Sequence, residues 1–481
     1  MMEGHNEEEI RKTVLAFGQD HVLQFVDQLS PEEKSELLSD LASVNFERLE
    51  AAFKVALGSL QNGTENKDDL LRPLEASICG STSVDPVQTS HWGKLGLSAV
   101  TEGKVAVLLL AGGQGTRLGF ANPKGMYKVG LPSGKTLYQI QAERILRLQT
   151  LASGANSIIP WYIMTSEFTK QATLEFFAQH NYFGLDSRNV IVFEQYTIPC
   201  LDLNGKLMLE SNHHICKAPD GNGGLYAALT NPKHHILKDM ESRGVAYVHV
   251  YCVDNILVKM ADPVFVGFCI EREAECGAKV VRKVQPDEKV GVICRCDGKY
   301  QVVEYSEISC NMAKRRNEDG SLVYSAGNIC NHFFTVDFLK QVSSVHDHSL
   351  PYHVAKKKIP YLNTQGQKVD PAEPNGIKLE KFVFDVFQFT NRLAVLEVVR
   401  EDEFSPLKNA PGADKDTPKT AMNDLMSLNY RQLCAAGVEI ETQSGVGSEV
   451  VECEVSPLVS YFGEGLQIYK GKKFRPPVLL E

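Results

Sequence analysis

The sequence predicts an α/β protein built on a mainly parallel mixed sheet. Two observations support this class. Short apolar runs alternate with helical patterns along residues 101–400, which is typical of parallel strands joined by crossover helices. The run at 105–110 (VAVLLL) is apolar on both faces, as expected of a strand buried inside such a sheet. The other strand candidates are the apolar runs 158–165, 190–193, 246–253 and 393–399.

The first hundred residues predict helices. In QLSPEEKSELLSDL, Ser30 is the expected N-cap, Pro31 the first helical residue and Glu33 the capping-box partner. We therefore expect a helical N-terminal region at 1–100 and a central α/β domain at 101–400. A polar segment rich in proline and aspartate then opens the part at 401–481, which predicts a linker and a small C-terminal domain containing strands.

Composition narrows the class of protein. The 481 residues are 43% hydrophobic and 23% charged, which is typical of a soluble globular protein with more than one domain. No run reaches the roughly 18 apolar residues of a membrane span, and the N-terminus is acidic and polar. The net charge of −10 disfavours a nucleic-acid partner.

The cysteines predict a reducing compartment. There are twelve, without a CxxC pair, so we expect free thiols in a cytoplasmic protein with no membrane partner. Cys294 and Cys296 form a lone CxC, which is typical of strand packing.

A glycine-rich turn follows the apolar run at 105–110. The segment reads AGGQGTRLG, and its glycines let the backbone bend sharply and let a ligand approach bare N–H groups. It lacks the GxGxxG spacing of a dinucleotide fingerprint. The later VGLPSGKT is one residue short of a Walker A loop, because Val129 stands where that loop needs glycine. The sequence therefore disfavours both familiar nucleotide loops.

Two cations lie close to this turn. Arg117 lies within it and Lys124 follows in NPKGMY, so four glycines and both cations fall within 13 residues. A tight βα connection would explain one glycine pair, but cations beside bare amides are typical of a phosphate site. We therefore expect this turn to hold phosphate.

Other polar residues have two interpretations each. Asp254 ends the apolar run of AYVHVYCVDN, where it could hold Mg²⁺ or cap the next turn. The loop at 220–224 (DGNGG) opens a predicted helix, where it could bind a ligand or only make a turn. Lys378, Lys408 and Glu304 could be ligand contacts or ordinary solvated charges. The residues alone leave these alternatives open.

Eight segments, in order, resemble the eukaryotic UDP-N-acetylhexosamine pyrophosphorylases and their close animal paralogues. The resemblance covers about residues 100 to 470, and the eight segments read LLLAGGQGTRLG, NPKGMY, PDGNGGLY, VYCVDN, VVEYSE, AGNICNHFF, PNGIKLEKFVFD and SPLKN. The resemblance implies a nucleotide-binding central domain of glycosyltransferase-A type. It also implies a uridylyltransferase that joins UTP and an N-acetylhexosamine 1-phosphate into UDP-N-acetylglucosamine and pyrophosphate, with UDP-N-acetylgalactosamine left open as a second product.

The same resemblance implies which residues contact the substrates. UTP would be bound by Leu110, Ala111, Gly112, Gly113, Lys124, Gln195, Gly221, Asp254 and Lys378. The sugar phosphate would be bound by Asn222, Glu304, Tyr305, Asn328 and Lys408. Gln195 and Gly221 would read the uracil edge, and Asn328 would contact the acetamido group.

Nucleotidyl transfer requires little covalent chemistry from a protein. A sugar-phosphate oxygen attacks the α-phosphorus in line, so positioning and charge neutralisation are the main needs. We therefore expect Mg²⁺ at Asp254, with Arg117 and Lys124 as the catalytic cations.

Other functions compete with this interpretation. A pyrophosphorylase specific for UDP-glucose would differ around Asn222 and Asn328. A sugar-transferring glycosyltransferase would typically carry an Asp-x-Asp motif, where this chain has VDN. A paralogue that binds a sugar nucleotide without turnover is the non-enzyme alternative. We expect a monomer or a homodimer.

Overall fold

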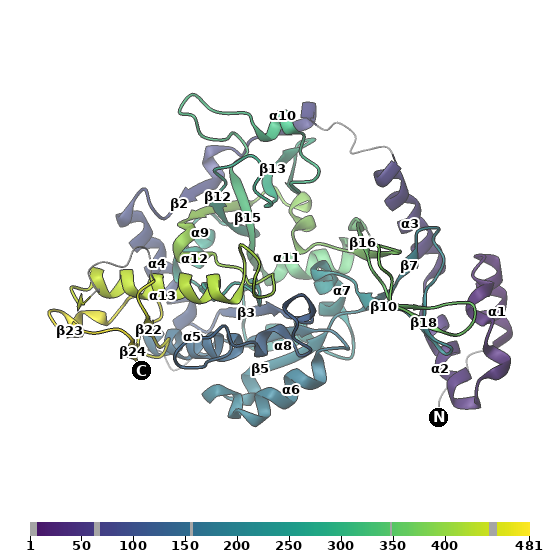
Figure 1. Cartoon of the computed structure of the whole chain (residues 1–481). Coiled ribbons are helices and arrows are strands. Elements are labelled where there is room, and N and C mark those ends of the chain that lie inside the picture. Colours follow the sequence, from purple (N-terminus) through teal and green to yellow (C-terminus); the bar gives the residue numbers. More distant parts are fainter. Residues whose placement is uncertain (1–6, 62–67, 154–156, 347–348, 442–449) are drawn as a thin grey trace. The chain divides into compact units, whose positions relative to one another are not determined.

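The computed structural model describes residues 7–61, 68–153, 157–346, 349–441 and 450–481 (Figure 1). The chain divides into two compact units. The smaller unit comprises Met1–Asn66, Gln195–Leu225 and His348–Asp385, and the larger unit comprises Lys67–Glu194, Tyr226–Asp347 and Val386–Glu481. The expected boundaries at residues 100 and 400 stay a prediction, because compact packing does not tell which segments fold alone. Among the described helices, none is long and apolar enough to cross a membrane.

The larger unit is built on one large sheet. Along its main path the strand order is β2-β20-β12-β15-β11-β3-β4-β5. The bounds are β2 Cys79–Ser81, β20 Leu393–Val398, β12 Cys276–Arg282, β15 Ala326–Thr335, β11 Tyr247–Cys252, β3 Val105–Leu110, β4 Trp161–Thr165 and β5 Val190–Glu194. Strand β15 is antiparallel to both neighbours, whereas the other pairs on this path are parallel. The mainly parallel mixed sheet is confirmed.

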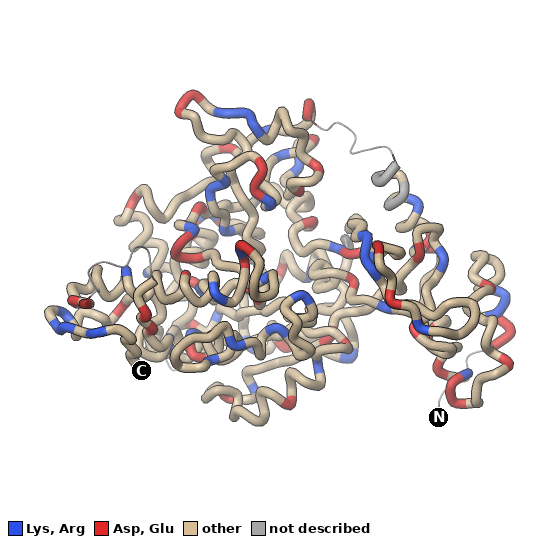
Figure 2. The backbone as a smooth tube through the Cα atoms, viewed as in Figure 1, with Lys and Arg blue, Asp and Glu red and all other residues tan. Residues whose placement is uncertain are grey.

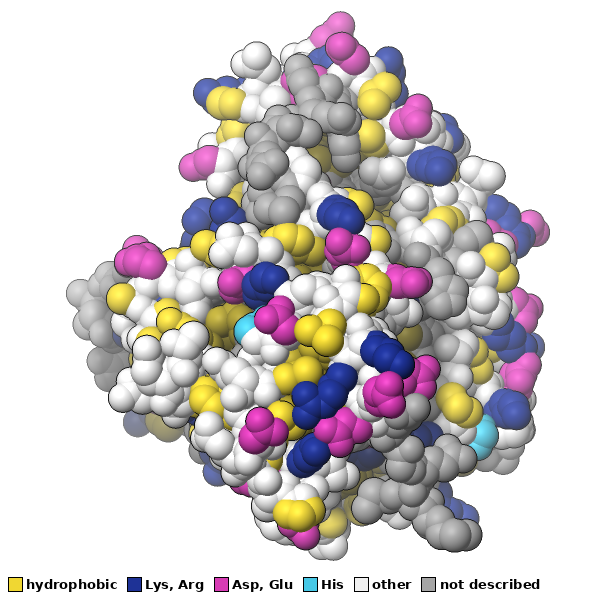
Figure 3. Space-filling model, turned by 90° about the vertical axis from the view of Figure 1, so that its right-hand side faces the viewer, with side chains coloured by type: hydrophobic (Ala, Val, Ile, Leu, Met, Phe, Trp, Pro, Cys, Tyr) yellow, Lys and Arg dark blue, Asp and Glu magenta, His cyan; other side chains and the backbone are white. Residues whose placement is uncertain are grey.

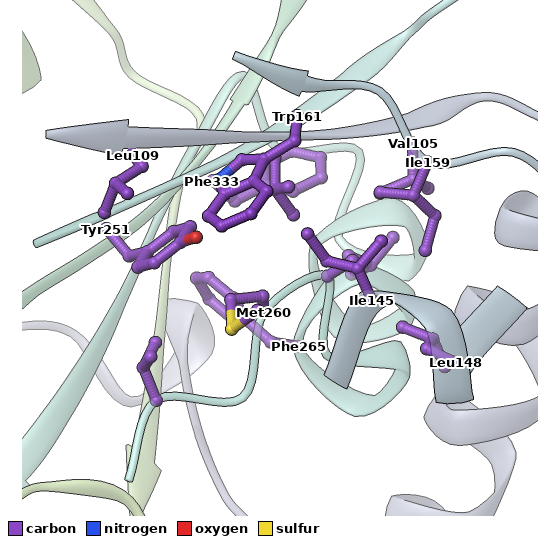
Figure 4. Packing of buried hydrophobic residues seen from close by; sticks show 14 of the residues in the cluster. Val105, Leu109, Ile145, Leu148, Ile159, Trp161, Tyr251, Met260, Phe265 and Phe333 are labelled. Carbon is purple, nitrogen blue, oxygen red and sulfur yellow. The ribbon is translucent and has the colours of Figure 1, made fainter. Parts of the chain in front are cut away.

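Helices cover both faces of this sheet. On one face, Trp161 and Phe333 pack in one apolar cluster with side chains of α4 (Pro86–Thr101), α5 (Leu137–Ala152) and α9 (Pro263–Glu271), as Figure 4 shows for Ile145 and Phe265. On the other face, Phe334 stacks on Phe338 of α11 (Val336–Gln341). Burial from both sides explains why every residue of β3 is buried and why its sequence is uniformly apolar.

The remaining elements of the larger unit are shorter. Strands β13 (Val292–Cys296) and β14 (Lys299–Val303) form a hairpin joined to β15 and to β1 (Leu71–Arg72). Cys294 and Cys296 are buried in β13, so the CxC packs in a strand as expected. The C-terminal segment has α13 (Pro418–Ala435) and the strand pairs β21–β23 and β22–β24. Their bounds are Glu439–Ile440, Lys473–Phe474, Cys453–Val455 and Val478–Leu480. Further helices are α6 (Lys170–Gln179), α7 (Leu225–Thr230), α8 (Ile236–Ser242), α10 (Cys310–Ala313) and α12 (Arg400–Glu403).

The smaller unit packs helices against short strands. Its helices are α1 (Glu7–Ala16), α2 (Pro31–Ala42) and α3 (Phe46–Gln61). Ser30 caps α2, and Glu33 completes the capping box as predicted. The strands are β6 Thr197–Pro199, β7 Leu201–Asp202, β8 Leu209–Ser211, β9 His214–Ile215, β10 Lys217–Pro219, β16 His353–Lys357, β17 Tyr361–Leu362, β18 Lys368–Val369 and β19 Gly376–Glu380. Leu37, Leu41 and Ile215 share the core of this unit.

Charges of both signs are interspersed along the chain. Figure 2 shows lysine and arginine positions next to aspartate and glutamate positions in most parts of the tube. Many of these charges form ion pairs within one unit, such as Arg282 with Glu397 and Lys217 with Asp40.

Candidate active site

The glycine turn leaves β3 with its first residues held in place. The N–H of Ala111 donates to the Met164 carbonyl at 2.8 Å, and the Ser166 hydroxyl donates to the Gly112 carbonyl at 2.8 Å. Gly113 is exposed, and a Cβ added there would meet nothing within 4 Å. Neither packing nor a positive φ therefore requires glycine at this position. Close approach of a ligand to the backbone would explain why this residue is glycine.

Lys124 and Asp254 lie beside each other in the larger unit. The Lys124 ammonium is 3.9 Å from the Asp254 carboxylate, and it donates to the Leu407 carbonyl at 3.1 Å. Both side chains are about four-fifths buried. Arg117 follows in the same loop as Gly113 and is exposed. The structure thus brings one predicted catalytic cation to the predicted metal ligand and leaves the other in solvent.

Asn255 ties the Asp254 loop to the segment that carries Lys408. Its Nδ2 donates to the Glu403 carbonyl at 2.7 Å, and its Oδ1 accepts from Ser405 N–H at 2.9 Å and from Leu257 N–H at 3.2 Å. The N–H of Leu407 donates to the Asp254 carbonyl at 2.9 Å. Asn255 therefore caps the turn after β11, and this capping role does not fall to Asp254.

A buried ionic cluster holds the other end of this segment. The fully buried Lys279 ammonium on β12 binds the carboxylates of Asp262 and Glu403. Lys259 binds the second oxygen of Glu403 at 2.9 Å. Burial opposes the charge on Lys279, but the two carboxylates outweigh it and raise the pKa of this lysine. The sheet thereby anchors the segment that leads to Leu407.

Lys408 lies on the same side of the larger unit as Asp254. It is exposed, and its N–H donates to the Asp416 carbonyl at 2.8 Å. The charges of Asp254 and Lys408 both change the pKa of the Cys252 thiol. The hydrogen bond with Cys330 and burial raise the pKa of Cys252 well above its usual value, Asp254 raises it further, and Lys408 lowers it. Lys124, Asp254 and Lys408 are thus gathered around the end of β11.

Glu304 and Asn328 flank Gly291. Asn328 N–H donates to the Gly291 carbonyl at 2.9 Å, and a Cβ on Gly291 would lie 2.8 Å from Glu304 Oε1. The Asn328 Oδ1 accepts from Cys330 N–H at 3.1 Å and lies 3.1 Å from His332 Nε2. Tyr305 is exposed and follows Glu304 directly after β14. The structure brings Glu304 and Asn328 to either side of Gly291, and Tyr305 is next to Glu304 in the chain.

In the smaller unit, Gln195 and the DGNGG loop form one hydrogen-bonded group. The Gln195 Nε2 donates to Asp220 Oδ1 and to the Gly221 carbonyl, both at 2.8 Å. Gly221 has a φ of +86°, and a Cβ there would lie 2.4 Å from the Lys381 carbonyl. Asn222 Oδ1 accepts from Val383 N–H at 2.9 Å. Gly221 must therefore be glycine for the fold itself, and α7 begins at Leu225 as expected.

Lys378 lies elsewhere in the smaller unit. It pairs with Ala355 in the β16–β19 ladder and is half-buried. Its charge lowers the pKa of the buried thiols of Cys200 and Cys216, which burial raises to about 11 and about 12. The structure places Lys378 beside these cysteines, so its predicted contact with the nucleotide stays a prediction.

Sequence reasoning missed the residues that position this site. Asn255 directly follows Asp254 in the VDN segment, so the motif contained this residue but not its hydrogen-bond partners. The roles of Ser166, of the Leu407 carbonyl and of the cluster around Lys279 depend on contacts between distant segments and have no local signature.

The chain is similar to known proteins over nearly its whole length. A family model described as UTP--glucose-1-phosphate uridylyltransferase matches residues 63–431. The chain is 51% identical to UDP-N-acetylhexosamine pyrophosphorylase-like protein 1 of Homo sapiens, over 99% of this chain and 97% of the relative. It is 43% identical to UDP-N-acetylglucosamine pyrophosphorylase of Saccharomyces cerevisiae, over 96% of this chain and 98% of the relative.

A solved structure extends the match to three dimensions. The uridine diphosphate N-acetylglucosamine pyrophosphorylase of Trypanosoma brucei superposes with a TM-score of 0.83 at 32% identity, covering 100% of this chain and 99% of that one. Similarity of this kind spans both units and the whole length of the chain. The chain therefore belongs to the uridylyltransferase family that the model describes, and within it to the UDP-N-acetylhexosamine pyrophosphorylases and their like proteins.

Proposed function

We propose that this protein transfers the uridylyl group of UTP to N-acetylglucosamine 1-phosphate and releases pyrophosphate. The observation that carries the proposal is the cluster of Lys124, Asp254 and Lys408 around the end of β11. Two cations and a carboxylate at the carboxyl edge of a parallel strand suit a reaction between two phosphorylated substrates. The yeast and trypanosomal relatives are named for the same activity.

Uridylyl transfer requires positive charges that are held in place near the phosphates. An oxygen of the sugar phosphate forms a bond to the α-phosphorus of UTP while the bond to pyrophosphate breaks, so electrons move from the attacking oxygen to the leaving group. Lys124 is held by the Leu407 carbonyl, which keeps its ammonium oriented before substrates bind. We assign it to the phosphates of UTP, and we assign Lys408 to the sugar phosphate.

The donors present fit Mg²⁺. Asp254 is a partly exposed carboxylate beside a lysine, and Mg²⁺ is usually held by one or two carboxylates together with substrate phosphates. When bound, Mg²⁺ would neutralise charge on the triphosphate. Asp254 would hold it, and Asn255 would keep Asp254 in place through the backbone.

Gln195 is suited to reading uracil. Its amide nitrogen is committed to Asp220 and Gly221, so its carbonyl oxygen is the group left to accept the N3–H of uracil. Cytosine has an acceptor at N3, which would face the Gln195 carbonyl oxygen and repel it. We propose that this contact, with the Gly221 N–H as a donor, selects UTP over CTP.

Asn328 is suited to an acetamido group by the same argument. Its Oδ1 is occupied by Cys330 and His332, so its Nδ2 is the group able to donate to an acetamido carbonyl. Glu304 supplies an acceptor for sugar hydroxyls. This arrangement favours an N-acetylated sugar over glucose.

The cell compartment and the assembly belong to the proposal as well. The twelve cysteines are free thiols, which supports a cytoplasmic location. A monomer or a homodimer agrees with the acidic composition of the chain.

Pyrophosphate release tests the activity. The purified chain is mixed with N-acetylglucosamine 1-phosphate, Mg²⁺ and either UTP or CTP, with a further arm in which EDTA removes the metal. We expect release only with UTP and Mg²⁺. If the chain binds UTP but releases no pyrophosphate, the non-catalytic alternative holds.

A further inference from the structure

A group of histidines and carboxylates in the smaller unit is independent of the proposed reaction. Helix α2 carries Glu33, Glu36 and Asp40 at spacings of three and four, so they share one face. The turn between β8 and β9 presents His213, and β9 begins with His214. Ion-pair contacts join these five side chains across the two elements.

Three of these side chains converge on one point. The Oε2 of Glu36 is 3.5 Å from His214 Nε2 and 3.7 Å from His213 Nε2, and the three ligand atoms all lie within 4.8 Å of one another. Zinc bonds of about 2.0–2.2 Å in a tetrahedral site place neighbouring ligand atoms about 3.3–3.6 Å apart. The 3.5 Å separation falls within that range and the 3.7 Å separation lies just above it, with no ion present to draw the ligands in.

The second nitrogen of each imidazole faces a different carboxylate. His214 Nδ1 is 3.2 Å from Asp40 Oδ2, and His213 Nδ1 is 3.7 Å from Glu33 Oε1. Metal-binding histidines characteristically donate their other N–H to a carboxylate, which fixes the tautomer and directs the free lone pair to the metal. With the proton of each ring on Nδ1, the lone pair of Nε2 would face Glu36; the Asp40 contact of His214 has hydrogen-bond length, and the Glu33 contact of His213 is an ion-pair contact only.

The two elements are held rigidly enough to preserve this geometry. Leu37 and Leu41 of α2 and Ile215 of β9 are buried in the same core. Lys217 binds the other oxygen of Asp40, which keeps that carboxylate beside His214. The side chains of Glu36, His214 and His213 are 54%, 43% and 25% exposed, so an ion can reach them from solvent. Figure 3 shows charged side chains of both signs spread over the face that it draws.

We infer that His213, His214 and Glu36 form a Zn²⁺ site that joins α2 to the β8–β9 hairpin. Two imidazoles and one carboxylate, with water as a fourth ligand, form a donor set that zinc takes in proteins. Magnesium prefers oxygen ligands and would not compete. The site is separate from the group around Asp254, so it stands or falls independently of the uridylyl transfer.

Zinc binding to the full chain tests the inference. The protein is freed of metal and titrated with Zn²⁺ by calorimetry, with excess Mg²⁺ present. Because twelve thiols can also bind zinc, Co²⁺ is used as a spectroscopic probe. Thiolate ligation gives a strong charge-transfer absorption that nitrogen and oxygen ligands do not give.

Three variants and one control define the outcome. Glu36 is half exposed, so Glu36→Gln removes a ligand without disturbing the core. The double variant His213→Ala/His214→Ala removes both imidazoles. Asp40→Asn keeps the ligands but weakens Zn²⁺ binding by about 10–100-fold. The control His91→Ala removes an exposed histidine that pairs with Glu271 in the larger unit.

We expect the wild type and the control to bind one more Zn²⁺ than the double variant, with a Co²⁺ spectrum free of thiolate absorption. We expect Zn²⁺ to raise the melting temperature of the wild type but not that of Glu36→Gln. Equal stoichiometry in the wild type and the double variant would overturn the inference. So would a site whose Co²⁺ spectrum shows only thiolate ligation.

Discussion

The ammonium of Lys124 lies 3.9 Å from the carboxylate of Asp254, and the Leu407 carbonyl holds it there. A lysine fixed between a carboxylate and a backbone carbonyl is oriented before the substrates arrive. Such preorganised charge costs no reorganisation when the triphosphate binds. Residues far apart in the chain form this relationship.

Lys124→Ala should lower kcat by about 10²–10³, by analogy with the loss of one oxyanion donor. The physical reason is the lost neutralisation of charge on the phosphates. Lys128→Ala is the matched control, because Lys128 lies four residues away and is exposed. Steady-state pyrophosphate release measures both. A Lys124→Ala enzyme with the kcat of the control would show that this lysine is not part of the chemistry.

Gly113→Ala should weaken the use of UTP while leaving the stability of the fold unchanged. Since a Cβ there meets nothing within 4 Å, the free energy of unfolding should change by no more than about 0.5 kcal/mol. A methyl group against the nucleotide should nevertheless lower kcat/KM for UTP by about 10². Urea unfolding and initial rates measure the two effects.

Gly125→Ala is the contrasting variant. A Cβ on Gly125 would lie 2.2 Å from the Tyr138 ring, so we expect it to cost about 1–3 kcal/mol of stability. If Gly113→Ala were as unstable as Gly125→Ala, the argument that a ligand explains Gly113 would be lost.

Asn255→Ala should loosen the segment before Lys408. The change leaves the buried N–H groups of Ser405 and Leu257 and the Glu403 carbonyl without their partner. We expect the free energy of unfolding to fall by about 2–4 kcal/mol. We also expect KM for the sugar phosphate to rise more than KM for UTP. Asn317→Ala, at an exposed loop position, is the control. Equal rises in both KM values would assign Asn255 a purely structural role.

Two buried histidines should make the fold sensitive to acid. Burial lowers the pKa of His249 to about 4 and that of His332 to about 3. His249 Nδ1 accepts from Ala261 N–H at 2.8 Å, so this ring must be neutral at Nδ1. Because both pKa values lie below the unfolded value near 6.5, the unfolded state binds protons first. The stability that the two neutral rings contribute is fully present above pH 6.5. It decreases as the pH falls, and it is lost at about pH 4 for His249 and about pH 3 for His332.

The slope of stability against pH measures this effect. Each histidine should contribute up to about 1.4 kcal/mol per pH unit between pH 6 and pH 4. His332→Phe keeps an aromatic ring beside Phe334 and Phe387 and should remove one of the two contributions. The exposed His91→Ala should leave the slope unchanged. An identical slope in His332→Phe and the wild type would contradict the prediction.

Local patterns predicted much of the fold and part of the site. The run VAVLLL became β3 residue for residue, and Ser30 caps α2, because strand burial and helix capping are set by neighbouring residues. The antiparallel insertion of β15 between β11 and β12 was not predicted, since strand order depends on long-range pairing.

The residues that position the site could not be predicted for the same reason. Asn255 Nδ2 bonds a carbonyl 148 residues later, and His214 contacts a carboxylate 174 residues earlier. A sequence motif reports chemistry near one point of the chain. Contacts of this length appear only when the fold is known.

The rate of pyrophosphate release with three sugar phosphates tests the central claim most directly. UTP and Mg²⁺ are supplied with N-acetylglucosamine 1-phosphate, N-acetylgalactosamine 1-phosphate or glucose 1-phosphate. Fast release with N-acetylglucosamine 1-phosphate, and little with glucose 1-phosphate, is the predicted result, and the galactosamine arm ranks the epimers. Faster release with glucose 1-phosphate, or no release with any sugar, would contradict the account.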